Sequence, residues 1–205
     1  MLIVTGMPRS GTSLMMRILN ALGLNIAGER HTLTSTEEFN PGGIWEVRNT
    51  VYDGIKEPIE GKDAIKLMMS GIERTPAEII DKVIFCLRDP REVIVSMRGQ
   101  RGEMKGKELD YNNWVVLKQA YRVWFELVVP EDWPHILVVN YHKLIEEPGV
   151  QVNRIATFLD LEPTKKAIDL IEPRLHRARR DKVPLSQQRI AKHVREYYRI
   201  MKEKA

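Results

Sequence analysis

Two glycines near the start of the chain, Gly6 and Gly11, have the spacing of a phosphate-binding loop. Glycines let the backbone turn tightly around an anion, so that successive N–H groups point at its oxygens. Thr12 and Ser13 follow the second glycine and supply hydroxyl donors at the start of a helix-like segment. These residue types in this order predict a binding site for a phosphate-bearing ligand.

The loop differs from that of a nucleoside triphosphatase at one position. Such loops continue with a lysine after the second glycine, whereas this chain has Thr12 there. The long cation of the loop is Arg9, which precedes the second glycine. Backbone amides at a helix N-terminus can still hold a phosphate. We therefore predict a phosphate-bearing ligand other than an ordinary nucleoside triphosphate.

A second candidate anion site follows the apolar run at residues 83–87. Arg88 comes directly after this run, Pro90 suits the first turn of a helix, and Ser96 lies further along that helix. Because a helix rises only about 1.5 Å per residue, the arginine and the serine can reach one anion. A guanidinium fork and a hydroxyl suit a phosphate. Taken by itself, this motif is also compatible with a surface salt bridge.

Short apolar runs alternate with helical patterns, which predicts an α/β protein with a P-loop NTPase-like, doubly wound parallel sheet flanked by helices. The predicted strands are residues 2–5, 63–68, 82–87 and 135–140. The predicted helices are residues 14–22, 75–81, 90–101, 111–129, 149–159, 164–171 and 185–204. Gly23 is expected to end the first helix, and Thr75 to cap the second. Ligands of such sheets bind at the carboxyl ends of strands, where both anion motifs stand.

Length and composition are those of a single domain over residues 1–205, with 43% hydrophobic and 29% charged residues. The net charge of +4 suits an anionic ligand but is too small to indicate a nucleic-acid partner. No apolar run approaches the ~18 residues of a membrane span, and a signal-peptide pattern is absent, so we expect a cytoplasmic protein without a transmembrane segment. The single cysteine, Cys86, lies in an apolar run and is expected to be a core thiol.

Together, the two anion motifs resemble those of the PAPS-dependent sulfotransferases, whose donor is 3′-phosphoadenosine 5′-phosphosulfate (PAPS) and whose product is PAP. Residues 6–13 are similar to the 5′-phosphosulfate loop, in the Pro-Arg-Ser-Gly-Thr form of bacterial and tyrosylprotein-type members. Residues 85–96 are similar to the 3′-phosphate motif, with the same Arg-to-Ser spacing. Residues 138–148 and 155–159 are similar to the segment that follows, although 141–143 lack its usual acidic pair. The resemblance implies a P-loop-like α/β fold that binds PAPS without a metal.

The resemblance implies a set of donor-binding residues: Pro8, Arg9, Ser10, Gly11, Thr12, Ser13, Arg88 and Ser96. Sulfuryl transfer builds charge on the leaving phosphate, and a cation placed there stabilises the transition state more than the ground state. Arg9 is the catalytic candidate for this role. Arg88 and Ser96 are expected to hold the 3′-phosphate, which the reaction does not change.

An acceptor hydroxyl or amine also needs a general base. The candidates belong to the polar segment after the first helix: Glu29, His31, Glu37, Glu38 and Glu46. Glu29 and Glu46 rank first, because each stands where a group of sulfotransferases has an acidic residue. Lys66 and the basic stretch 176–182 are each open to two interpretations, as ligand contacts or as solvated cations.

Two other functions remain open at this stage. A P-loop small-molecule kinase is disfavoured by the missing lysine, and magnesium dependence would distinguish it. A non-catalytic PAP- or nucleotide-binding protein shares the same binding residues, and acceptor-dependent release of PAP would distinguish it. The sequence leaves open whether the acceptor is a small molecule, carbohydrate, lipid or peptide, and it leaves the oligomeric state open.

Overall fold

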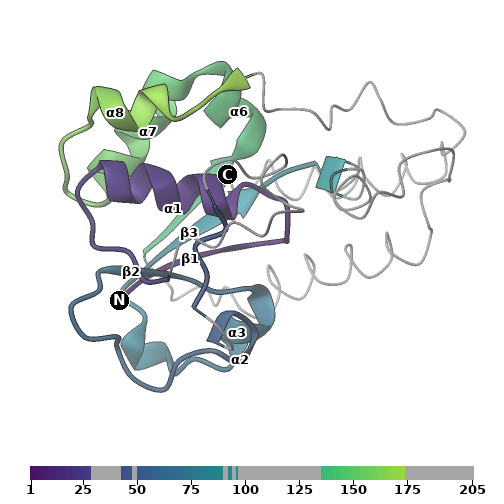
Figure 1. Ribbon diagram of the computed structural model, residues 1–205, viewed down its shortest axis with the longest axis vertical. Coiled ribbons are helices and arrows are strands. Elements are labelled where there is room, and N and C mark those ends of the chain that lie inside the picture. Colours follow the sequence, from purple (N-terminus) through teal and green to yellow (C-terminus); the bar gives the residue numbers. More distant parts are fainter. Residues whose placement is uncertain (29–42, 48–49, 90–91, 94–95, 97–134, 174–205) are drawn as a thin grey trace, which may run out of the picture.

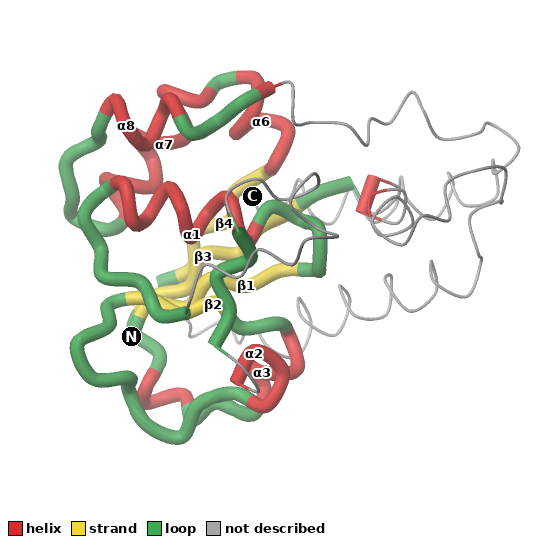
Figure 2. The backbone as a smooth tube through the Cα atoms, viewed as in Figure 1, coloured by secondary structure: helices red, strands yellow, loops and turns green. Residues whose placement is uncertain are grey.

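The computed structural model describes residues 1–28, 43–47, 50–89, 92–93, 96 and 135–173. These residues contain one parallel sheet (Figure 2), whose strands are β1 (Leu2–Gly6), β2 (Ala64–Lys66), β3 (Lys82–Leu87) and β4 (Ile136–Asn140). The strand order is β2-β1-β3-β4, and each neighbouring pair is parallel. All four predicted strands are therefore confirmed, and the second is shorter than expected.

Helices cover both faces of this sheet (Figure 1). One face carries α1 (Thr12–Ala21), α6 (Tyr141–Glu146), α7 (Pro148–Phe158) and α8 (Lys165–Asp169). The other carries α2 (Thr50–Asp53), α3 (Met69–Glu73) and the 3₁₀ turn η1 (Ala77–Ile79). The result is the predicted α/β architecture, a parallel sheet between two helical layers.

Alternation along the strands builds a core on each face, because successive strand side chains point to opposite sides of a sheet. Ile3 and Phe85 pack in the cluster that includes Ile72 of α3. Val4 and Ile84 pack in the cluster that includes the helices on the other face. Both faces are covered, which is why the strands read as continuous apolar runs.

Most predicted helices that fall on described residues are confirmed. The first, at 14–22, forms α1, and Gly23 ends it with φ 101° while its N–H donates to the Asn20 carbonyl. The pair at 149–159 and 164–171 forms α7 and α8. Residues 111–129, 185–204 and most of 90–101 lie outside the described residues.

The predicted helix at 75–81 is wrong, since only the short turn η1 forms there. Thr75 is also wrong as its cap. The Thr75 hydroxyl donates to the Gly71 carbonyl at 2.8 Å and accepts from the Ile55 N–H at 3.1 Å. It therefore ties α3 to the preceding loop, and a long-range contact has replaced the local cap.

The strand order places the ends of β1 and β3 side by side. Gly6 pairs with Cys86 in the sheet register, so the loop after β1 and Arg88 after β3 leave the sheet as neighbours. A Cβ on Gly6 would lie 2.5 Å from the Cys86 carbonyl oxygen, and Gly6 has φ 148°. Only glycine lets these two strand ends approach so closely. In the strand order, β2 lies on the outer side of β1 and β4 on the outer side of β3. The chain therefore leaves β1 and β3 in opposite directions, so the carboxyl ends of these two strands form a topological switch point.

Candidate functional site

The loop after β1 leads directly into the N-terminus of α1. Ser10 N–H donates to the Met7 carbonyl at 3.0 Å, Arg9 has φ 70° and Gly11 has φ 104°. The first turn of α1 carries no acidic residue, and no side chain caps its N-terminus, so no carboxylate there competes with an anion for the helix amides. Positive helix-end charge and free N–H groups together favour an anion at this position.

Two buried hydroxyls lie in the same loop region. Thr5 is 0% and Ser10 is 1% exposed, and neither side-chain oxygen has a hydrogen-bond partner among the described residues. Buried polar atoms in native proteins are usually paired with protein, water or a ligand. These hydroxyls therefore fit a loop that surrounds a polar ligand.

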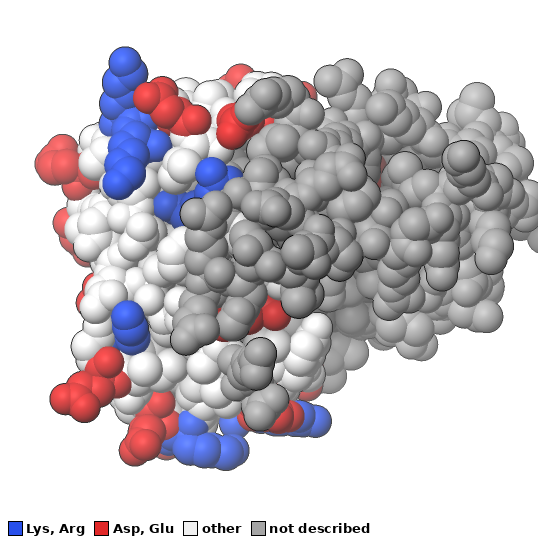
Figure 3. All heavy atoms as spheres, in the orientation of Figure 1, with Lys and Arg blue, Asp and Glu red and all other residues white. Residues whose placement is uncertain are grey.

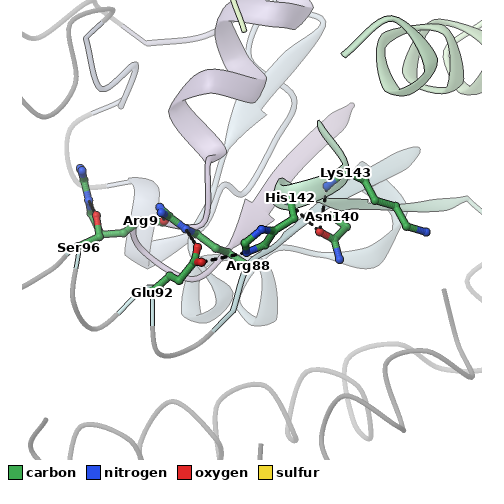
Figure 4. A network of polar contacts seen from close by, with 7 residues as sticks. All are labelled: Arg9, Arg88, Glu92, Ser96, Asn140, His142 and Lys143. Atoms are coloured by element: carbon green, nitrogen blue, oxygen red, sulfur yellow. Dashed lines mark hydrogen bonds and ion pairs between the residues drawn. The ribbon is translucent and has the colours of Figure 1, made fainter. Parts of the chain in front are cut away.

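The two anion motifs are joined by their arginines (Figure 4). Arg88 Nη1 donates to the Arg9 carbonyl at 3.0 Å, across 79 residues of sequence. Arg88 Nε donates to Glu92 Oε2 at 3.1 Å, and the Tyr141 ring centroid lies 4.3 Å from the guanidinium. Arg9 Nε donates to Ser96 Oγ at 3.0 Å. Arg9, Arg88 and Ser96 are thus brought together, with the Ser96 hydroxyl in contact with Arg9.

The electrostatics of this cluster favour an anion. Burial lowers the pKa of Arg9, and the nearby Arg88 charge lowers it further. Arginine nevertheless stays protonated in proteins, so two mutually repelling guanidinium groups persist close together. Burial raises the pKa of Tyr141, which keeps that hydroxyl protonated beside them. A bound phosphate would relieve the repulsion that these two cations feel.

A second polar cluster lies beside the start of α1. Lys66 ends β2 with its side chain 1% exposed, and its Nζ lies 2.8 Å from Glu46 Oε1 and 3.4 Å from Ser13 Oγ. The Ile44 carbonyl accepts from Lys66 Nζ and, at 3.2 Å, from Ser13 Oγ. Burial lowers the pKa of Lys66, while Glu46 opposes that shift. The solvated interpretation of Lys66 is therefore wrong: this lysine is buried and joins Glu46 to the phosphate loop.

Some of the other predicted residues belong to the part of the chain that the structure describes. Thr12 is 4% exposed and begins α1, and Pro8 lies in the loop. The base candidates Glu29, His31, Glu37 and Glu38 and the basic stretch 176–182 lie outside the described residues. Of the two leading base candidates, the structure therefore describes Glu46.

Sequence reasoning missed three residues of the site: Glu92, Tyr141 and His142. Glu92 could have been noticed because it is a carboxylate four residues after Arg88, in the helix predicted at 90–101. Tyr141 directly follows the carboxyl end of β4, the edge at which ligands bind. The ring of Tyr141 also lies against Gly11, where a Cβ would come 2.8 Å from Tyr141 Cδ2.

Neither sign of charge dominates the surface in view. On this face, the basic and acidic side chains of the described residues are interspersed (Figure 3).

The described residues were also searched for metal sites and membrane spans. Among them, no group of three His, Cys, Asp or Glu is placed to hold a metal ion. Within the same residues, no helix has the length and hydropathy of a membrane span. Independence from metal remains a prediction.

A glycine loop and two neighbouring arginines, Arg9 and Arg88, lie at the switch point of a parallel sheet. This arrangement is typical of an anion-binding α/β protein. The sulfotransferase domain model matches residues 1–199, and the chain belongs to this family. A 3-beta-hydroxysteroid sulfotransferase of Cavia porcellus is 33% identical over 102 residues, which are 44% of this chain and 35% of that protein. The match thus spans about a third of that relative.

Two solved sulfotransferase structures share the fold. The sulfotransferase domain of a Synechococcus olefin synthase has a TM-score of 0.56 at 16% identity, covering 97% of this chain and 94% of that one. A sulfotransferase of Mycobacterium avium has a TM-score of 0.52 at 14% identity, covering 96% of this chain and 75% of that one. These likenesses confirm the predicted P-loop-like α/β fold.

Proposed function

We propose that this chain transfers the sulfuryl group of PAPS to a hydroxyl or amine acceptor and releases PAP. The observation that carries the proposal is the hydrogen bond from Arg88 to the Arg9 carbonyl, because it makes the two anion motifs one site. PAPS carries anionic groups at two positions of one nucleotide, and a joined pair of anion sites suits such a ligand. Membership of the sulfotransferase family supports the same donor.

The proposed donor-binding residues fall into groups according to the part of PAPS to which each is assigned. The loop amides of residues 8–13 and the Arg9 guanidinium are assigned to the 5′-phosphosulfate. Arg88 is assigned to the 3′-phosphate, held on one side by Glu92 and on the other by the Tyr141 ring. Ser96 contacts Arg9 here, so we assign it to the boundary between the two groups.

In the reaction, the acceptor oxygen or nitrogen forms a bond to sulfur while the bond from sulfur to the phosphate oxygen breaks. The acceptor proton passes to a base, and the bonding electrons leave with PAP. Arg9 and the amides of α1 stabilise the charge that grows on the leaving phosphate. Because they are held in place beforehand, little reorganisation is needed during the step.

Glu46 is the described candidate for the base. Its carboxylate is 34% exposed, so an acceptor can reach it, and Lys66 ties it to the side of Ser13. Glu29 remains the second candidate for the same role.

Calorimetry tests the donor assignment. With EDTA present, we expect PAP to bind and ATP to bind far more weakly. Magnesium-dependent ATP binding without PAP binding would instead support a small-molecule kinase. Lys66 makes this comparison necessary, because it places a buried ammonium beside the loop that lacks the usual lysine.

Turnover is tested by acceptor-dependent release of PAP from PAPS. A panel of hydroxyl and amine acceptors should include a 3β-hydroxysteroid, the substrate class in the name of the Cavia porcellus relative. Carbohydrates, lipids and peptides complete the panel. Binding of PAP with no release above the acceptor-free rate would support a non-catalytic PAP-binding protein.

A further inference from the structure

The orientation of Arg88 depends on a buried carboxylate. Glu92 is 0% exposed, and its Oε2 accepts from Arg88 Nε at 3.1 Å. A fully buried carboxylate requires partners, because desolvation of an unpaired charge costs several kcal/mol. The position of Glu92 therefore determines where the Arg88 guanidinium is held.

His142 holds the other oxygen of this carboxylate. Its Nε2 lies 3.1 Å from Glu92 Oε1, so Glu92 stands between a guanidinium and an imidazole (Figure 4). His142 belongs to α6, which follows β4, whereas Arg88 and Glu92 follow β3. Two separate elements thus fix the two oxygens of a single carboxylate.

The backbone of His142 is itself held in place. The Asn140 side chain caps α6, with Oδ1 accepting from the N–H of His142 at 2.9 Å and of Lys143 at 3.4 Å. Such caps contribute about 1 kcal/mol to a helix end. Tyr141 packs beside it against Arg88. The capped start of α6 therefore fixes the backbone from which the His142 imidazole reaches Glu92.

The charges that face His142 come from the segment after β3. Its contact with Glu92 is the main cause that raises its pKa, and the Asp89 carboxylate adds to the effect. Burial and the Arg88 charge act in the opposite direction. Lys143, the next residue of α6, points away from this cluster in Figure 4.

We propose that His142 is a positioning residue of the donor site, which acts through Glu92 to hold Arg88 toward the 3′-phosphate. The inference rests on the proposed function. With His142 protonated, Glu92 shares its charge between two cations, and more of the Arg88 charge is available to an anion. Loss of that proton removes the His142 charge from Glu92, so the carboxylate neutralises more of the Arg88 charge and the site for PAP is weakened.

The test is the dissociation constant of PAP measured by calorimetry between about pH 7 and about pH 9, where the second phosphate pKa of about 6 has been passed. We expect the affinity of the wild-type protein to fall about five-fold or more across this range, the lower end of typical coupling between sites. His142→Gln keeps an N–H donor without a titrating charge, so its affinity should vary little with pH. Lys143→Ala removes a positive charge from the same turn and should follow the wild type.

A second readout uses the wild-type protein alone. The imidazole C–H resonance of His142, assigned by comparison with H142Q, should give a pKa above 6.5 that rises further when PAP binds. A pKa that PAP leaves unchanged, or equal pH dependence in the wild type and H142Q, overturns the inference. Failure of the wild type to bind PAP at any pH overturns the proposed function itself and the inference with it.

Discussion

Replacement of Gly11 by alanine tests whether the phosphate loop and α6 are built against each other. Gly11 has φ 104°, and a Cβ there would lie 2.8 Å from Cδ2 of Tyr141. Gly23 supplies a matched control, since it has φ 101° and a Cβ there would meet nothing within 4 Å. Both variants strain the backbone in the same way, and only Gly11→Ala adds a steric contact.

The expected cost follows from these two terms. Placing a residue with a Cβ in this backbone region costs about 1–2 kcal/mol, and loss of freedom in the unfolded chain offsets about 0.4–1 kcal/mol of it. Gly23→Ala should therefore destabilise the protein by about 1 kcal/mol. Overpacking against the Tyr141 ring adds about 1–3 kcal/mol to Gly11→Ala. The difference between the variants isolates the contact with the ring.

Urea unfolding followed by circular dichroism measures this difference. With slopes of about 1–3 kcal/mol per molar urea, Gly11→Ala should unfold roughly 1 M lower than Gly23→Ala. Calorimetry should also show weaker binding of PAP by Gly11→Ala, because a displaced Tyr141 ring no longer packs on Arg88. Equal midpoints for the two variants would refute the argument that the ring closes on the loop.

Four further outcomes are expected. Arg88→Ala should mainly weaken PAP binding in calorimetry, whereas Arg9→Ala should mainly slow PAP release, by on the order of 10²–10³; equal effects on affinity alone would contradict these roles. Glu46→Gln should lower turnover by roughly 10²–10⁴ with PAP affinity retained, if Glu46 is the base. The Cys86 thiol, whose pKa burial raises to about 12, should resist thiol reagents at about pH 8 until urea unfolds the protein. Because the pKa of His142 is raised in the folded protein, its stabilising contact is complete below its ordinary value of 6.5 and is lost as pH rises through the raised value. The stability difference between wild type and H142Q should therefore shrink at alkaline pH.

The sequence by itself determined the sheet and the residue types of the candidate anion site. Strands buried on both faces are mostly apolar along their length, so β1 and β3 were visible as nearly continuous apolar runs. The glycines of the loop and the arginine after β3 were visible because backbone geometry and charge restrict those positions locally. The fold class followed from the alternation of strands and helices.

Other features depended on the tertiary structure. The short helices α2, α3 and α6 carry too few residues for a helical period to appear, and Thr75 took long-range partners in place of a cap. The sequence left Lys66 open to two interpretations, a ligand contact or a solvated cation, and only the fold around Glu46 shows that it is buried.

The pairing of charged groups was likewise decided in three dimensions. Ser96 is spaced to share an anion with Arg88, and in the fold its hydroxyl contacts Arg9, whose carbonyl accepts from Arg88. His142 reaches Glu92 from an element that is distant in sequence. Sequence spacing fixes which groups share one helix face, whereas the packing of β3, β4 and α6 decides which buried carboxylate meets which cation.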